Sequence, residues 1–181
     1  MRSPEEVLKF WFVEHGSDDW YAGRPEFDAA ISDQFGQTHS HVAKGEAWEW
    51  RKNLDGRLAE IIVLDQFSRQ LFRGRPEAFA QDKMALALAQ EVVALGWDRE
   101  LPVERRAFVY LPFMHAESVA IQAVSVRLYQ GLGAEEQLEY ALKHQETIAR
   151  FGRFPFRNDA LGRESTAEET AYMQEQAGRS F

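Results

Sequence analysis

The sequence predicts an all-α fold, and three features of the chain support this prediction. Apolar residues recur at the three- and four-residue intervals of an amphipathic helix through most of the sequence. Several of these stretches begin at proline or at a capping serine or threonine, and several end at glycine. The β-branched run at residues 58–64 continues into Asp65-Gln66-Phe67 without a turn signal, so its length favours a helix over a strand.

The first helix is predicted over residues 4–14. Ser3 can cap it, Pro4 takes the first helical position, and Glu6 stands three residues after the serine. Its apolar residues are Val7, Leu8, Phe10, Trp11 and Phe12. Because they cover more than one face, we expect this helix to be inserted into the core.

A second helix is predicted over residues 25–42, from Pro25 to a stop at Gly45. His39 and His41 fall in its final turn, where the helix dipole favours positive charge. We therefore expect both histidines to face solvent rather than to form a site. In the connection that follows, Trp48 and Trp50 are expected to cover the core from outside.

The next predicted helix, residues 55–72, carries Asp65, Arg69 and Arg73 at intervals of four, which places them on one face. A local ion pair between Asp65 and Arg69 is one interpretation of this spacing. Later helices are predicted over residues 78–95, 103–129, 134–151 and, from the capping box at Thr166, to about 176. Pro112 should kink or split the helix over residues 103–129.

Length and composition predict one compact domain spanning residues 1–181. The chain is 45% hydrophobic and 13% aromatic, which is enough apolar bulk for a folded core. It has no cysteine, which excludes disulfides, thiolate metal sites and cysteine catalysis. The acidic, amphipathic amino terminus differs from a secretory signal, and no apolar run reaches membrane-spanning length. We expect a soluble cytoplasmic protein with no membrane partner; the oligomeric state stays open.

The net charge of -8 argues against nucleic acid as a partner, because binding to phosphates needs a basic face. Arginine is nevertheless concentrated in two short segments, residues 64–75 and 150–163. In the stretch from Arg150 to Asn158, arginines alternate with aromatic residues around Pro155. Such an arrangement suits bidentate recognition of a carboxylate or phosphate beside an apolar wall.

We therefore expect the chain to bind an anionic small molecule or a peptide carboxylate. The predicted ligand-binding residues are Asp65, Arg69, Arg73, Arg150, Arg153, Arg157, Asn158 and Arg163. The alternative is that these arginines form a purely structural network within a protein-interaction scaffold. Their partners would then be acids such as Asp65, Asp82, Glu117 or Glu169.

A third possibility is an enzyme with hydrolase-like acid–base chemistry. Its candidate catalytic residues are His115, Glu117 and His144, since histidine titrates near neutral pH. His115 and Glu117 would point to different faces of a regular helix, so only a distorted turn could bring them together. No metal-ligand spacing and no cofactor motif are present, so neither a metal nor a cofactor is expected.

Several stretches, in order along nearly the whole chain, resemble domain-of-unknown-function family 924. They are residues 7–12, 63–69, 110–117, 150–158 and 161–166. The resemblance implies a tetratricopeptide-repeat-like fold of antiparallel helix pairs stacked into a right-handed superhelix. No activity is established for the family, so it implies no catalytic residues. Ser68 replaces an expected proline and Phe156 an expected histidine, which argues against histidine chemistry in the arginine turn here.

Overall fold

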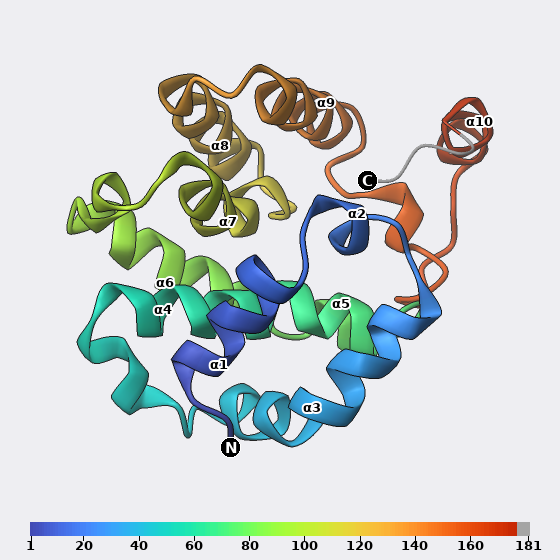
Figure 1. Cartoon of the computed structure of the whole chain (residues 1–181). Helices are drawn as coiled ribbons and strands as arrows, with labels where there is room; N and C mark the ends of the chain where they lie inside the picture. The colour runs from blue at the N-terminus through green and yellow to red at the C-terminus, as the bar shows by residue number, and fades with distance from the viewer. Residues whose placement is uncertain (177–181) are drawn as a thin grey trace.

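Helices form every regular element in residues 1–176, the part of the chain that the computed structural model describes, and no strand occurs there (Figure 1). The all-α prediction is therefore confirmed. The longer helices are α1 (Pro4–Lys9), α3 (Pro25–Ala43), α4 (Leu54–Ile62), α6 (Asp82–Ala94), α7 (Val103–Met114), α8 (Val119–Leu132), α9 (Glu135–Phe151) and α10 (Ala167–Glu175). Shorter elements join them: η1 (Phe10–Glu14), α2 (Ser17–Trp20), η2 (Trp48–Lys52), η3 (Val63–Phe67), α5 (Ser68–Leu71), η4 (Pro76–Phe79), η5 (Trp97–Glu100) and η6 (Pro155–Arg157).

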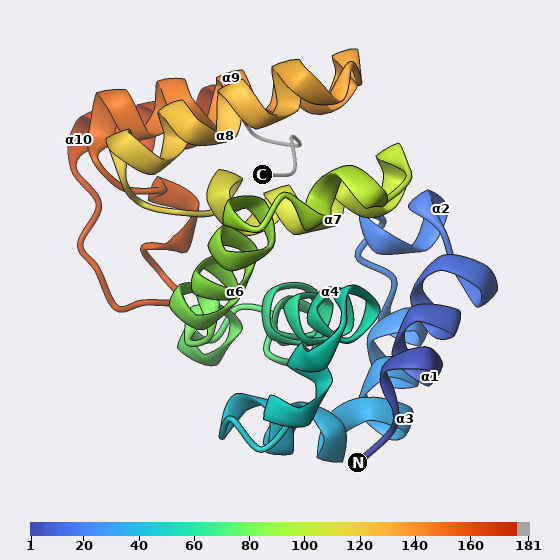
Figure 2. The same ribbon diagram turned by 90° about the vertical axis from the view of Figure 1, so that its left-hand side faces the viewer.

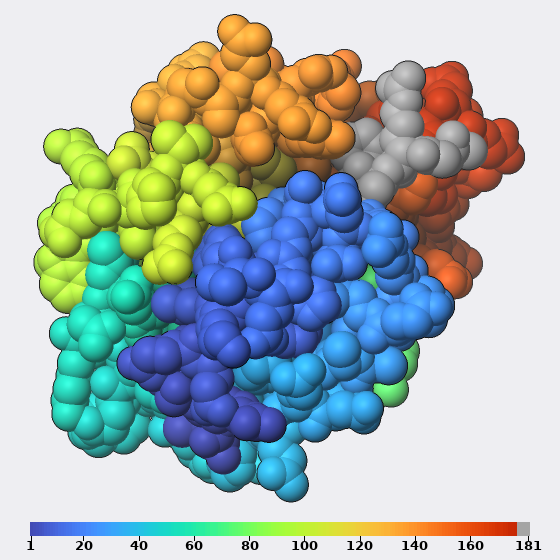
Figure 3. Space-filling view, viewed as in Figure 1, coloured from blue at the N-terminus to red at the C-terminus, as the bar shows by residue number. Residues whose placement is uncertain are grey.

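The amino-terminal segment is only partly inserted into the core: Val7, Leu8, Phe10 and Trp11 are buried, whereas Lys9 and Val13 are exposed. Phe10 and Trp11 are almost fully buried, and the Trp11 ring contacts the rings of Trp20, Phe67 and Phe108 at centroid distances of 5.5 to 5.6 Å. In Figure 3 the amino-terminal residues fill the centre of one face. One hydrophobic cluster runs from α1 to α9 and unites these elements.

The carboxyl-terminal half is built by successive packing of α6 on α7, α7 on α8 and α8 on α9. Figure 2 shows α8 and α9 side by side above α7, with α10 at the edge. The right-handed superhelix implied by the family resemblance stays a prediction. None of the helices in the described residues has the length and apolarity needed to cross a membrane.

The predicted helix over residues 55–72 is present, but it contains a π-helical turn. The chain runs from α4 through the π turn η3 into α5 without a break. A π turn holds more residues per turn than an α-helix, and such turns are frequent at functional sites. All five residues of η3 are buried, including Asp65 and Gln66.

The predicted interruption between residues 103 and 129 is confirmed, but it lies after Pro112. Helix α7 continues through Pro112 to Met114, and the chain leaves the helix at residues 115–118. Near the end of a helix a proline removes only one backbone hydrogen bond, so two more residues remain helical. This shift places His115 and Glu117 in the turn between α7 and α8.

The prediction that His39 faces solvent is wrong. His39 is 6% exposed, and its Nε2 donates to the Ser68 Oγ at 2.8 Å, because that hydroxyl donates its own proton to the Leu64 carbonyl. The side of α3 that carries His39 packs on η3 and α5. His41 is half-buried, with 45% of its side chain exposed, and pairs with Glu46. Trp50 is buried, whereas Trp48 is exposed.

Candidate functional site

The candidate site is a cleft of about 470 Å³ between three segments that are distant in sequence. These are the η4–α6 region, the turn between α7 and α8, and the loop from η6 towards α10, which approaches α6 in Figure 2. Its apolar lining includes Phe79, Leu86, Pro112 and Leu161, and its polar lining includes Asp82, Lys83, His115, Glu117, Arg157 and Arg163. Volume and mixed lining match those of small-molecule sites.

Arg157 is held rigidly in the wall of this cleft. Its guanidinium lies 4.6 Å from the ring centroids of both Phe79 and Phe154, which sets it between two aromatic groups. Nη1 donates to Asp82 Oδ2 at 3.1 Å, and Nη2 donates to the His115 carbonyl at 2.9 Å. Burial, and secondarily repulsion by Arg69, lowers the pKa of Arg157 to about 10.

Asp82 serves two arginines at once. Besides Arg157, it accepts hydrogen bonds from Arg69 Nη1 at 3.0 Å and Nη2 at 3.2 Å. Arg69 also lies 3.2 Å from Asp65 Oδ1, so the local ion pair expected from the spacing exists. Asp65 and Arg69 therefore lie close to Arg157 in the stretch from Arg150 to Asn158, with Asp82 as the bridge.

Asp65 and His115 form a buried hydrogen-bonded pair beside this bridge. The Asp65 carboxyl is 1% exposed; its Oδ1 accepts from His115 Nδ1 at 2.8 Å and its Oδ2 accepts from Gln66 at 2.6 Å. Although burial opposes ionisation, Arg69 and His115 together hold the pKa of Asp65 well below its usual range. Burial, with repulsion by Arg69, lowers the pKa of His115 despite the attraction of Asp65.

His115 keeps one nitrogen available. Because a carboxylate accepts hydrogen bonds, Nδ1 carries the proton and the neutral ring has its lone pair on Nε2. Within residues 1–176, Nε2 has no protein hydrogen-bond partner. The His115 side chain is 13% exposed and the residue lines the cleft, so we take Nε2 to be open to water or a ligand there.

The three candidate catalytic residues do not form one hydrogen-bonded group. Both carboxylate oxygens of Glu117 accept from Arg163 at 2.8 Å, and one also accepts from the Phe154 amide at 2.9 Å. The rings of His115 and His144 are 6.3 Å apart, and His144 Nδ1 donates to the Tyr140 carbonyl at 2.8 Å. Burial and the proximity of His115 lower the pKa of His144 to about 3.

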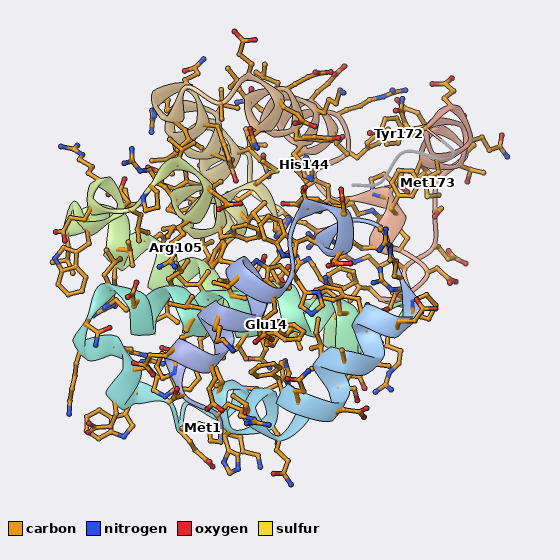
Figure 4. All side chains as sticks on the ribbon, viewed as in Figure 1. Met1, Glu14, Arg105, His144, Tyr172 and Met173 are labelled. Atoms are coloured by element: carbon orange, nitrogen blue, oxygen red, sulfur yellow. The ribbon has the colours of Figure 1, made fainter. Side chains whose placement is uncertain are left out.

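Arg153 and Asn158 lie beside α10 rather than in the cleft wall. Arg153 donates to both carboxylate oxygens of Glu169, at 2.7 and 2.9 Å, and Asn158 donates to the same carboxylate at 3.3 Å. The hydrogen bonds from Arg153 outweigh the opposing effect of burial and lower the pKa of Glu169 to about 2. On the other side of α10, Tyr172 points towards α9 (Figure 4) and contacts Thr147 Oγ1 at 2.8 Å.

Two predicted ligand-binding arginines lie elsewhere. Arg73 pairs with Asp28 of α3, because α5 ends at Leu71 and the four-residue spacing does not continue to position 73. Arg150 pairs with Glu168 on the surface between α9 and α10. Neither lines the cleft.

Sequence reasoning missed Phe79, Lys83, Leu86 and Leu161 as cleft residues. They look like ordinary helix and loop positions, and only the packing of distant segments brings them together. Asp82 was foreseen only as an arginine partner. No group of three or more histidine, aspartate or glutamate residues in the described chain is placed to hold a metal ion.

Comparisons with known proteins agree with this fold. A family model described as a bacterial protein of unknown function, DUF924, matches residues 7–177. The solved structure of the protein of unknown function ATU0120 from Agrobacterium tumefaciens is 37% identical, with a TM-score of 0.90 over 95% of this chain and 97% of that one. No curated protein matches. The chain therefore belongs to the DUF924 family of bacterial proteins of unknown function.

Proposed function

We propose that this protein binds a small anionic molecule in the cleft beside Arg157. The main support for the proposal is the environment of Arg157. Its side chain is only 13% exposed, and its guanidinium contacts the rings of Phe79 and Phe154 in the cleft wall. Its carboxylate partner, Asp82, is shared with Arg69. Arg69 pairs with Asp65 as well, whereas in the described part of the chain Arg157 has only the carboxylate that it shares. An anion in the cleft would give the Arg157 guanidinium a partner of its own and would stabilise it.

The charges of the cleft support an anionic ligand. Lys83, Arg157 and Arg163 contribute three positive charges against two negative charges from Asp82 and Glu117, an excess of one. Lys83 is exposed and has no ion pair within residues 1–176. An exposed lysine and a fixed arginine in the same lining suit a charged ligand that enters from water.

The apolar part of the lining favours a small organic anion over a bare ion. Phe79, Leu86, Pro112 and Leu161 present hydrocarbon surface next to the charged groups. A ligand with a carboxylate or phosphate at one end and a short carbon skeleton would bury both parts.

The structural-network alternative accounts for other arginines better than for Arg157. Arg153 and Arg163 each make a bidentate ion pair with a carboxylate of their own, Glu169 and Glu117. These pairs fasten the carboxyl-terminal segment to the helices. Hydrolase-like chemistry is supported less than binding, because Glu117 is committed to Arg163 and supplies no second acid–base group to His115.

The test is thermal unfolding at constant ionic strength with increasing succinate or inorganic phosphate. A ligand that binds only the folded state raises the unfolding midpoint as its concentration increases. At one hundred times its Kd it adds about 2.7 kcal/mol to the free energy of unfolding. Arg157→Ala should lose this response. Arg127→Ala, at an exposed position of α8 outside the cleft lining, should keep it. If neither anion raises the unfolding midpoint of the wild-type protein, the proposal is contradicted.

A further inference from the structure

The tautomer of His115 is fixed by its surroundings. Asp65 is buried and ionised, and it is held by Gln66 and Arg69 on its other contacts. Its carboxylate can only accept a hydrogen bond, so the proton of His115 stays on Nδ1. Nε2 is consequently a hydrogen-bond acceptor that cannot switch to a donor while the ring is neutral.

The position of His115 is fixed as well. Its carbonyl accepts from Arg157 Nη2 at 2.9 Å, and its ring is anchored through Nδ1 to Asp65 at 2.8 Å. The side chain is 13% exposed, and the residue forms part of the cleft lining. The cleft therefore presents a rigid cation and, on the residue bonded to it, a rigid acceptor that water reaches.

These two groups together define a class of ligand. An anionic group satisfies Arg157, while the lone pair of His115 Nε2 requires a donor such as a hydroxyl. A ligand without that donor would displace water from Nε2 and leave its lone pair unmatched, which weakens binding.

We infer that the cleft selects small anions that carry a hydroxyl group near the carboxylate or phosphate, and that His115 Nε2 accepts the hydrogen bond of that hydroxyl. This inference rests on the proposed anion site. His115 acts here as a specificity-determining residue, because the anion itself is bound by Arg157.

If His115 had only a structural role, its Nε2 would not be needed. The hydrogen bond from Nδ1 to the Asp65 carboxylate is enough to join the α7–α8 turn to η3. His115→Asn separates the two roles, since the asparagine amide can donate from nearly the same place as Nδ1 but offers nothing at the position of Nε2. The variant should keep the fold while losing the acceptor.

The experiment measures binding of two matched pairs by calorimetry: malate against succinate, and glycerol 1-phosphate against propyl phosphate. Members of each pair differ in their hydroxyl groups, and comparison between the pairs tells carboxylate from phosphate. Wild type should bind the hydroxylated member about 3- to 10-fold more tightly in the preferred pair, the contribution of one hydrogen bond. In His115→Asn the two members should bind equally, with the weaker affinity.

The outcomes separate this inference from the proposed function. Equal binding of both members of each pair by wild type overturns the selectivity and leaves the anion site standing. Preference for the hydroxylated member that persists in His115→Asn overturns the role of His115. Absence of binding by all four compounds overturns the anion site and this inference together.

If His115→Asn fails to fold, nitrogen-15 spectra of the wild-type histidines decide the question. The hydroxylated anion of the preferred pair should keep the Nε2 resonance of His115 in the range of a hydrogen-bonded acceptor nitrogen or move it further that way. Its partner, at equal saturation, should move that resonance the opposite way, because it displaces water and offers no donor. Equal shifts with both compounds, or no shift with either at saturation, reject His115 as the acceptor.

Discussion

Asp65 Oδ1 and His115 Nδ1 are joined by a hydrogen bond of 2.8 Å across 50 residues of sequence. Each partner comes from an irregular element: Asp65 from the π turn η3, and His115 from the turn that ends α7. Regular helices would have rotated these side chains differently, so the pair depends on both departures. It links the core to the cleft wall.

Removing the Asp65 carboxylate should strongly destabilise the protein. In Asp65→Ala the Arg69 guanidinium, whose side chain is 19% exposed, loses one of its two carboxylates, and His115 Nδ1 loses its acceptor. We expect a loss of about 3 to 5 kcal/mol in the free energy of unfolding, measured with urea. Asp33→Ala, at an exposed position of α3, should change it by less than about 0.5 kcal/mol. Equal effects of the two substitutions would show that the buried network contributes little.

Two glycines in helices should respond in opposite ways to alanine. A Cβ at Gly56 would lie 1.9 Å from the Trp50 carbonyl oxygen, so Gly56→Ala must push α4 away from η2 and lower the unfolding midpoint. A Cβ at Gly36 of α3 meets no atom within 4 Å, and Gly36→Ala should stabilise by about 0.5 to 1 kcal/mol. Gly56→Ala at wild-type stability would contradict the close approach of these two elements.

Much of this fold was predictable from local signals. The capping boxes at Ser3 and Thr166 form as expected, because a cap and its partner are only three residues apart. The pairing of Arg69 and Arg157 with Asp65 and Asp82 was also predictable, since buried arginine needs nearby carboxylates. Both inferences use short-range rules or charge balance.

The remaining features depend on tertiary packing. The π turn at residues 63–67 has no sequence signal that sets it apart from an α-helix, yet it helps to bury Asp65. His39 was expected in solvent because its helix position is terminal, but contact with α5 buries it. Phe79 became a cleft residue only through contact with Arg157, which lies far along the chain.

Mild acid should destabilise the protein through its buried histidines. Burial and the proximity of His115 lower the pKa of His144 from 6.5 to about 3, and burial also lowers that of His39. Between those pH values the unfolded chain binds protons that the folded chain does not, so stability is full above about pH 6.5 and falls as the pH drops.

Each such histidine contributes a slope of up to about 1.4 kcal/mol per pH unit in that window. Urea unfolding between pH 7.5 and 5 measures it, and His144→Gln should have a shallower slope than wild type. His41→Gln, at a position where 45% of the side chain is exposed, should retain the wild-type slope. A stability that is flat with pH down to 5 would falsify this account.

Arg153 and Arg157 should differ when each is replaced by alanine. Arg153 fastens α10 through Glu169, a side chain that is 3% exposed and caps the start of that helix. Arg153→Ala therefore leaves a buried carboxylate without its ion pair, and α10 should detach more readily, with faster proteolysis at residues 159–166. The anion response of the cleft should survive, because Arg153 is not part of its lining. Arg157→Ala should remove the anion response and leave proteolysis of this loop close to wild type. Limited proteolysis and thermal unfolding with succinate on both variants would separate the two roles. If both variants lose the anion response, or if neither does, Arg157 has no distinct part in binding.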